Sequence, residues 1–388
     1  MKQGWEIKKL GEVCEIVGGS TPKTKEPTYW NGEYYWATPA DLNGSKYISS
    51  TMRTITDAGI KSAHLQLLPI GTVLLSSRAP IGKVAITTVP MYCNQGFKNL
   101  ICGNTLNNGY AYWFLSYNTD YLNSIGTGAT FKEISKTVVE QIPITIPPLS
   151  EQERIVAELD LLSDVIAKKR EQLKQLDTLA QSIFYDMFGD PITNEKGWET
   201  STIDNVCSSI IRGPFGSALK KEFFVEKGDS TYKVYEQKNA INKNALIGTY
   251  YISTEMYKSL SRFEIFPNDI IMSCSGTIGE LFVIPFDAER GIINQALLKF
   301  TLNKKIEQNY FLFMMNLMKS KMDVKGCGIQ NIGSVKYIKA TMFGLPPLAL
   351  QQQFASMIES IEKQKELIKQ SLSEVQQLFD SRMDYYFG

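Results

Sequence analysis

The sequence contains one long helical pattern twice, and this repeat constrains the fold more than any other feature. The first copy runs from Pro147-Pro148-Leu149 to Phe188-Gly189, and the second from Pro346-Pro347-Leu348 to Phe387-Gly388. Apolar residues recur at alternating spacings of four and three in both copies. Such spacing, kept over more than four heptads, is typical of a coiled-coil seam, which needs a partner helix. The best-matched partner for each copy is the other copy.

Corresponding seam positions lie 199 residues apart (354 minus 155). The predicted seam residues are Ile155, Leu159, Leu162, Ile166, Leu173, Leu176 and Ile183 in the first copy, and Phe354, Ile358, Ile361, Ile368, Leu372, Val375 and Phe379 in the second. Lys169 and Lys365 interrupt the seam near its middle. A polar seam residue can fix the register of a coiled coil, but long Lys side chains more often extend to the solvent edge, which we favour here.

The repeat also covers the sequence before each helix. Gly4-Trp5-Glu6 recurs as Gly197-Trp198-Glu199, and Asn94-Gln95 recurs as Asn294-Gln295. The distance in sequence between corresponding residues changes only from 193 to 200. An internal duplication of this period predicts that the chain consists, in order, of a globule, a long helix, a second globule and a second long helix. We therefore predict four segments, two globular domains and two long helices, at residues 1–149, 150–189, 190–347 and 348–388.

Short apolar runs alternate with turn residues in both globules, which predicts an α+β fold of two similar mixed domains. The first helix leads from globule one to globule two, so the second must run back to bury its seam. The pair is then antiparallel, and a pseudo-two-fold axis relates the halves. We expect Ser150 to cap the first helix with Glu153 completing a capping box. We also expect an extended segment from Lys339 to Leu345.

Composition bounds the class of protein. The chain has 388 residues, 43% hydrophobic and 21% charged, which is typical of a globular protein of two or three domains. No run of 18 apolar residues and no signal-peptide core is present, and no two of the six cysteines form a C-x-x-C pair, so we expect a reduced, cytoplasmic protein. The globules each carry a net charge of +3 and the helices −3 and −2, a weak sign that the globules contact nucleic acid.

Motifs for catalysis are missing from the sequence. His64 is the only histidine, which disfavours zinc sites built on histidine pairs and Ser-His-Asp triads. The stretch from Gly18 to Thr24 mimics a phosphate-binding loop, but Pro22 stands where that motif needs its second glycine and lacks the N–H group. We therefore predict a non-catalytic chain without a metal site.

Turns of both globules carry polar and basic residues suited to DNA. Arg and Lys suit phosphates and guanine, whereas Asn and Gln suit adenine edges. The alternative for each residue is a solvated turn, and the two Asn-Gln pairs equally fit a structural role at strand ends. The candidate DNA-binding residues are Lys23, Lys25, Thr38, Asp41, Ser77, Arg78, Asn94, Gln95, Lys98 and Lys132 in globule one, and Arg212, Lys220, Lys221, Gln237, Lys238, Asn239, Ser275, Asn294, Gln295, Gln330 and Asn331 in globule two.

Taken together, these features resemble the specificity (S) subunit of type I restriction-modification systems over essentially the whole chain. The resemblance rests on Gly4-Trp5-Glu6, on the run from Gly71 to Gly82, on Asn94-Gln95-Gly96, and on the run from Pro147 to Gln152, repeated in this order before each long helix. Globule two departs from the pattern at two places. Ser275-Gly276-Thr277 replaces Arg78-Ala79-Pro80, and Leu350-Gln351 replaces Glu151-Gln152.

The resemblance implies a non-catalytic, DNA-binding coiled-coil subunit in which each globule, a target recognition domain, reads one half of a split DNA target. The helices would separate the domains and dock two methyltransferase (M) subunits, and restriction/translocase (R) subunits would complete the assembly. S-adenosylmethionine, ATP and Mg would then belong to the partner subunits. The alternatives are a duplicated protein-binding scaffold without DNA specificity, and a complete enzyme with an unrecognised active site.

Overall fold

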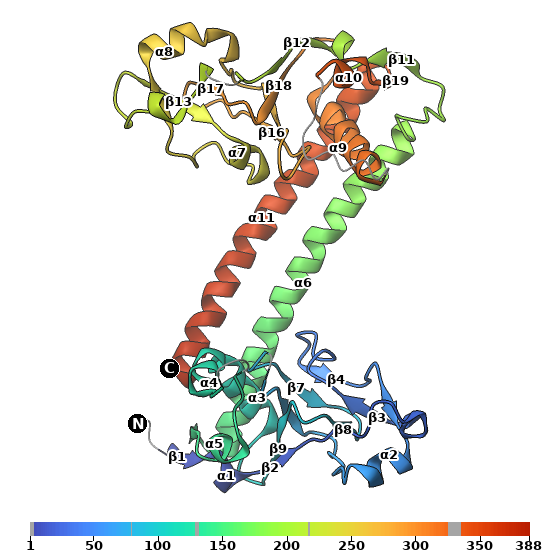
Figure 1. Ribbon diagram of the computed structural model, residues 1–388, viewed down its shortest axis with the longest axis vertical. Helices are drawn as coiled ribbons and strands as arrows, with labels where there is room; N and C mark the ends of the chain where they lie inside the picture. The colour runs from blue at the N-terminus through green and yellow to red at the C-terminus, as the bar shows by residue number, and fades with distance from the viewer. Residues whose placement is uncertain (1–3, 79, 129–131, 216–217, 325–334) are drawn as a thin grey trace. The chain divides into compact units, whose positions relative to one another are not determined.

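The computed structural model describes residues 4–78, 80–128, 132–215, 218–324 and 335–388. The chain divides into two compact units, Met1–Glu171 with Lys369–Gly388, and Gln172–Ile368. The chain has two 40-residue helices, α6 (Leu149–Phe188) and α11 (Leu348–Phe387) (Figure 1). Each helix is divided between the two units, with one part in each. Both begin directly after a Pro-Pro pair, as predicted.

The first unit contains a two-stranded sheet β1-β10, a five-stranded sheet β2-β9-β6-β7-β4 and a three-stranded sheet β5-β3-β8. Its strands are β1 (Glu6–Lys9), β2 (Cys14–Gly18), β3 (Trp30–Ala37), β4 (Tyr47–Ile48), β5 (Thr54–Ile55), β6 (Val73–Leu75), β7 (Val84–Thr87), β8 (Tyr92–Cys93), β9 (Lys98–Cys102) and β10 (Pro143–Ile146). Its shorter helices are α1 (Leu10–Val13), η1 (Pro27–Tyr29), α2 (Asp57–Ser62), α3 (Asn108–Tyr117), α4 (Thr119–Ile125) and α5 (Lys136–Glu140).

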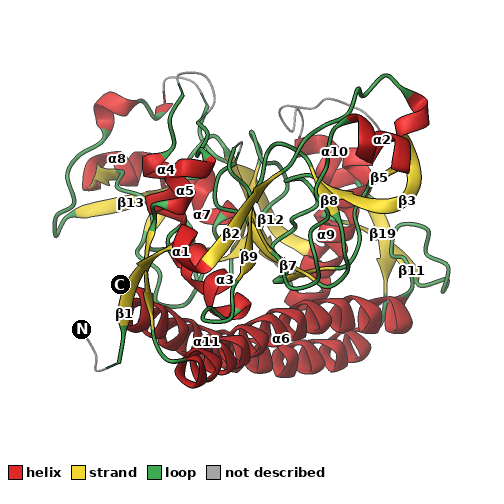
Figure 2. Cartoon of the chain, turned by 90° about the horizontal axis from the view of Figure 1, so that it is seen from below, coloured by secondary structure: helices red, strands yellow, loops and turns green. Residues whose placement is uncertain are grey.

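The second unit repeats this construction with sheets β11-β19, β12-β18-β15-β16 and β14-β13-β17. Its strands are β11 (Glu199–Thr202), β12 (Cys207–Arg212), β13 (Thr231–Tyr235), β14 (Tyr251–Ser253), β15 (Ile270–Ser273), β16 (Leu281–Val283), β17 (Gly291–Ile293), β18 (Leu297–Leu302) and β19 (Met342–Leu345). Its shorter helices are η2 (Asp204–Val206), η4 (Lys221–Phe223), α7 (Gln237–Ile241), α8 (Thr254–Ser259), η5 (Ser261–Phe263), α9 (Gln308–Val324) and α10 (Val335–Ala340). Both units combine helices with mainly antiparallel strands, which confirms the α+β class (Figure 2).

The internal repeat is confirmed at the level of single hydrogen bonds. In the turn after β6, Ser76 Oγ accepts from the Lys83 N–H and donates to the Pro80 carbonyl, both at 2.8 Å. In the turn after β15, Ser273 Oγ accepts from Glu280 N–H at 3.0 Å and donates to the Thr277 carbonyl. Each serine is 0% exposed, so the duplicated turn is held by one buried hydroxyl in either unit.

A buried glutamine anchors the start of each long helix. Gln152, in α6, accepts from the Asn107 N–H and donates to the Pro147 carbonyl, both at 2.8 Å. Gln351, in α11, makes the same pair of bonds to Glu307 and Pro346, again at 2.8 Å. Both glutamines are 0% exposed. These amides therefore satisfy backbone groups at the junction of globule and helix that would otherwise be buried without partners.

In the first unit, the N-terminal part of α6 packs against the C-terminal part of α11. Ile155 and Tyr386 belong to one hydrophobic core with α3, and Arg154 donates to the Tyr386 hydroxyl at 3.1 Å. Farther along α6, Arg170 donates to Gln376, which lies earlier in α11. Partner numbers fall in α11 as they rise in α6, so the two segments are antiparallel, as predicted.

The second unit shows the same orientation with the other two helix segments. Asp177 pairs with Lys365 at 2.8 Å, and Phe184, farther along α6, packs edge-to-face on Phe354, with ring centroids 5.5 Å apart. The Lys365 ammonium also pairs with Glu362, and the two carboxylate side chains are 65% and 54% exposed. This confirms that Lys365 extends to the edge of the seam. All fourteen predicted seam residues are buried or half-buried.

Two local predictions were wrong. Ser150 is not the N-cap, because α6 already begins at Leu149 and the Pro148 carbonyl accepts from the Glu151 and Gln152 N–H groups. The proposed extended segment 339–345 begins too early, since Lys339 and Ala340 end α10 and only Met342–Leu345 forms β19. Local backbone bonds to Pro148 set the start of α6, whereas pairing with β11 sets the start of β19.

Candidate nucleic-acid interface

In the first unit, backbone hydrogen bonds tie together the loops that follow β2, β3, β6 and β8. The Asn94 N–H donates to the Ala37 carbonyl at 2.9 Å, and the Ser77 N–H donates to the Gly96 carbonyl at 2.8 Å. The Ser20 N–H donates to the Cys93 carbonyl at 3.1 Å. These loops bring one connected set of residues together, here named the first cluster: Thr21, Thr38, Asp41, Ser77, Arg78, Asn94, Gln95 and Lys98.

Gln95 is the exposed tip of the first cluster, beside a structural asparagine. Asn94 Oδ1 accepts from the Gly96 N–H at 2.9 Å, which shapes the turn. The exposed Gln95 side chain accepts a hydrogen bond from the Thr21 hydroxyl. Asn94 therefore serves the structural role that the sequence left open, whereas Gln95 presents its amide toward solvent.

Other candidates of the first cluster are engaged within the fold. Asp41 accepts from the Thr38 N–H at 2.7 Å, from the Thr38 hydroxyl at 2.6 Å, and from the Met52 N–H at 2.7 Å. Lys98, whose side chain is 13% exposed, pairs with Glu133 at 3.1 Å and donates to Ser77. Contact with DNA through Lys98 would compete with Glu133.

The three other lysine candidates of globule one are exposed and lie outside the first cluster. Lys23 and Lys25 precede η1, and the Lys23 carbonyl accepts from the Trp30 indole at 3.3 Å. Lys132 donates to the Asn123 carbonyl at 3.4 Å. Their ammonium groups suit phosphate contact rather than base recognition.

The second unit builds an equivalent set of loops. The Asn294 N–H donates to the Tyr235 carbonyl at 3.0 Å, the Cys274 N–H to the Ala296 carbonyl at 2.8 Å, and Arg212 Nε to the Gln295 carbonyl at 3.2 Å. Asn294 Oδ1 accepts from the Ala296 N–H, as Asn94 does in its own turn. The residues brought together, here named the second cluster, are Arg212, Phe215, Gln237, Ser275, Asn294 and Gln295.

Neighbours of the second cluster on α7 have structural bonds. Asn239 is 0% exposed, accepts from the Glu236 N–H at 2.8 Å, and donates to the Asn244 and Ile247 carbonyls. Direct contact of Asn239 with DNA would require this capping box to open. Lys238 pairs with Glu236 at 2.7 Å. Gln237 differs, because its buried Oε1 has no hydrogen-bond partner among the described residues.

The remaining candidates of globule two lie apart from the second cluster or outside the described residues. Lys220 and Lys221 are exposed at the start of η4, where Lys220 pairs with Glu222 at 3.4 Å. Gln330 and Asn331 lie outside the described residues. DNA contact by every candidate remains a prediction.

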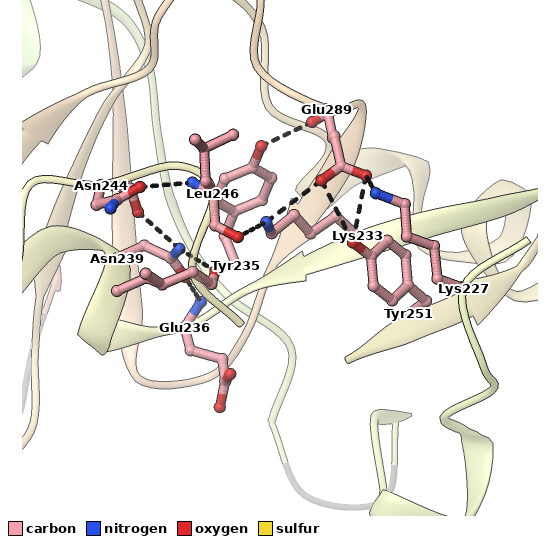
Figure 3. A network of polar contacts seen from close by, with 10 residues as sticks. Lys227, Lys233, Tyr235, Glu236, Asn239, Asn244, Leu246, Tyr251 and Glu289 are labelled. Atoms are coloured by element: carbon pink, nitrogen blue, oxygen red, sulfur yellow. Dashed lines mark hydrogen bonds and ion pairs between the residues drawn. The ribbon is translucent and has the colours of Figure 1, made fainter. Parts of the chain in front are cut away.

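A network around Glu289 supports the small sheet beside the second cluster (Figure 3). The Glu289 carboxylate pairs with Lys227 at 2.8 Å and with Lys233 at 3.5 Å, and accepts from the Tyr251 hydroxyl. The Lys233 side chain is 0% exposed and also donates to the Leu246 carbonyl at 3.0 Å. The hydrogen bond from Lys227, together with the charge of Lys233, holds the pKa of Glu289 below its ordinary value.

Replacing Glu289 with glutamine should destabilise the second unit by about 2 kcal/mol at neutral pH, because the buried Lys233 ammonium loses its carboxylate. A carboxylate with a lowered folded-state pKa stabilises above its unfolded pKa, and that contribution is lost as the pH falls through the folded value. The difference between wild type and Glu289→Gln in urea unfolding should therefore shrink below about pH 4. Asp287→Asn, at an exposed position in the same loop, is the control, and an equal effect there would contradict this role.

Sequence patterns did not identify three residues, Thr21, Phe215 and Arg53. Thr21 lies in the stretch that mimics a phosphate-binding loop. It stands 194 residues before Phe215, which is the spacing of the internal repeat, and this spacing could have paired the two residues. The Arg53 guanidinium lies 3.7 Å from the Trp30 ring centroid, a stacking contact that no sequence spacing indicates.

Two buried cysteines adjoin the clusters and remain neutral. Burial raises the pKa of Cys93, next to Asn94, to about 12, and that of Cys274, next to Ser275, to about 11. Among the described residues, no group of three or more His, Cys, Asp or Glu side chains is placed to hold a metal ion. Within the same described ranges, no helix has both the length and the apolar character to cross a bilayer.

Two solved structures share this fold over nearly the whole chain. One, described under "Structural basis underlying complex assembly and conformational transition of the type I R-M system", has a TM-score of 0.63 at 17% identity and covers 100% of this chain and 98% of that chain. The other is the type I restriction-modification S subunit from M. genitalium, with a TM-score of 0.58 at 14% identity, covering 99% and 96%. The fold is therefore that of type I specificity subunits.

Sequence comparison shows the family. The model of the type I restriction modification DNA specificity domain matches residues 2–177 and again residues 195–377, so the chain belongs to this family and carries two such domains. The type I restriction enzyme MjaIX specificity subunit of Methanocaldococcus jannaschii is 29% identical over 387 residues, covering 92% of this chain and 86% of the relative.

Proposed function

We propose that this chain is the DNA sequence-recognition subunit of a type I restriction-modification complex, with one half of a split target bound by each domain. The observation that carries the proposal is the duplicated turn with an exposed glutamine at its tip, Gln95 in one unit and Gln295 in the other. A glutamine amide can bond adenine edges in the major groove. Two such turns in one chain match a target with two separated half-sites.

The long helices supply the spacing and the docking surface in this proposal. Each helix has 40 residues, which at ~1.5 Å each span roughly 60 Å, or about 18 base pairs of duplex. Their outer faces would dock two methyltransferase subunits, which restriction/translocase subunits then join. The relatives are specificity subunits, and we propose that this chain is likewise non-catalytic, with S-adenosylmethionine, ATP and Mg bound by the partner subunits.

Selection from random duplexes tests this function against the alternative of a protein-binding scaffold. The chain assembled with its methyltransferase partner should enrich duplexes that carry two fixed half-sites and an unread spacer. Binding to the enriched duplex should weaken steeply between ~50 and ~200 mM salt, because phosphate contacts release counterions. If no sequence is enriched over the random pool, or if binding does not change with salt concentration, the protein-binding scaffold is favoured.

A further inference from the structure

Phe215, in the second cluster, is a large aromatic residue that the fold leaves in solvent. Its side chain is 68% exposed, and the Arg212 guanidinium lies 5.4 Å from its ring centroid. The residues before it are fixed: Pro214 and Gly213 are buried, and the Gly213 N–H donates to the Leu297 carbonyl at 3.0 Å. An exposed ring on a fixed backbone beside a cation is suited to stacking on a planar partner.

The duplicated fold identifies the residue of unit one that corresponds to Phe215. A Cβ added to Gly213 would lie 1.9 Å from the Asn294 carbonyl oxygen, and one added to Gly19 would lie 2.0 Å from that of Asn94. Both glycines thus allow the same close approach of two backbones, which makes them equivalent positions. Two residues farther along the chain, Thr21 occupies the place that Phe215 occupies in unit two.

The two units therefore differ in chemistry at one matched position. In unit one, the Thr21 hydroxyl donates to the Gln95 side-chain carbonyl, which leaves the Gln95 amide hydrogens to face a ligand. In unit two, Phe215 has no hydroxyl to hold Gln295 and offers a ring face instead. Two domains that recognise different half-sites must differ in chemistry at equivalent positions.

We propose that Phe215 stacks on a nucleobase of the half-site bound by the second domain, with Arg212 close to the neighbouring phosphate or base. The inference rests on the proposed function and names a specificity-determining residue within it. The faces of paired bases are covered by their neighbours, so the ring would enter as an apolar wedge that partly unstacks one base step, next to the bases whose edges Gln295 contacts. The Thr21–Gln95 pair would act at the equivalent step of the other half-site by hydrogen bonding alone.

The test is binding of the enriched duplex by the assembled methyltransferase complex carrying Phe215→Ala. Loss of base stacking should weaken binding roughly 5- to 150-fold, and the dependence of affinity on salt should stay unchanged because no charge is removed. Phe215→Trp should restore affinity. Duplexes with 2-aminopurine at successive positions should show a fluorescence change at one position of one half-site with wild type, and none with Phe215→Ala.

Phe286→Ala is the matched control, because Phe286 is 90% exposed in the same unit but lies in the loop before β17, at the opposite end of that strand from Asn294. It should bind like wild type. Phe215→Ala binding within twofold of wild type, or an equal loss in Phe286→Ala, would overturn the stacking role. A wild-type complex that fails to prefer the split target would instead refute the proposed function itself. Thermal unfolding of both variants should match wild type, since neither ring is buried.

Discussion

Inserting one heptad into each long helix should lengthen the unread spacer of the DNA target by about three base pairs. Seven residues add ~10 Å of helix, and three base pairs span about the same distance along duplex DNA. A heptad also turns the helix by nearly two full turns, so the apolar seam keeps its face. Placed after Glu171 in α6 and after Ile368 in α11, the insertions leave both compact units intact. Methylation at the original target should disappear and appear at the longer one.

The control for this experiment is the same heptad placed in α6 alone. A single insertion leaves part of one seam without its partner, so methylation at every spacer length should fall sharply. A double-insertion variant that methylates the original spacer at wild-type level would show that the helices do not set the distance between half-sites.

Removing the Gln152 amide should cost the first unit roughly 2–4 kcal/mol of stability. In Gln152→Ala, the Asn107 N–H and the Thr105 and Pro147 carbonyls lose their partner at a position that is 0% exposed. Each buried polar group left without a hydrogen bond costs about 1–3 kcal/mol, partly recovered where water enters. Gln351→Ala should also destabilise the second unit, because Gln351 makes the bonds that correspond to those of Gln152 with Asn107 and Pro147.

Gln172→Ala and Gln353→Ala, at exposed positions of the same helices, provide matched controls and should shift stability by less than about 0.5 kcal/mol. Urea unfolding measured with probes in each unit separates the two effects. If Gln152→Ala unfolds at the same urea concentration as Gln172→Ala, the buried amide does not hold the helix to the globule.

Sequence patterns predicted the repeat, the long helices and their antiparallel packing because these features depend on local periodicity and on order along the chain. The apolar spacing placed Ile155 and Phe354 in the seam, and the turns after β6 and β15 were located by small and polar residues around Gly82 and Gly279. Each of these signals lies within a few residues of the structure it predicts.

The side-chain partners could not be predicted because they depend on approaches between distant segments. Lys98 meets Glu133, 35 residues away, and Gln152 bridges to Asn107, 45 residues away. Asn239 looked suited to DNA in the sequence, yet the folded turn around α7 holds its amide in a capping box and in bonds to Asn244 and Ile247. Separating exposed tips such as Gln95 from anchors such as Asn94 required the folded turn.

The most direct test of the account is a genome-wide map of methylated adenines in a host that expresses this chain with its methyltransferase partner. We predict a split motif with an unread spacer, relaxed in one half by Gln95→Ala and in the other half by Gln295→Ala. A contiguous motif, or two variants that relax the same half, would contradict the claim that each domain reads its own half-site.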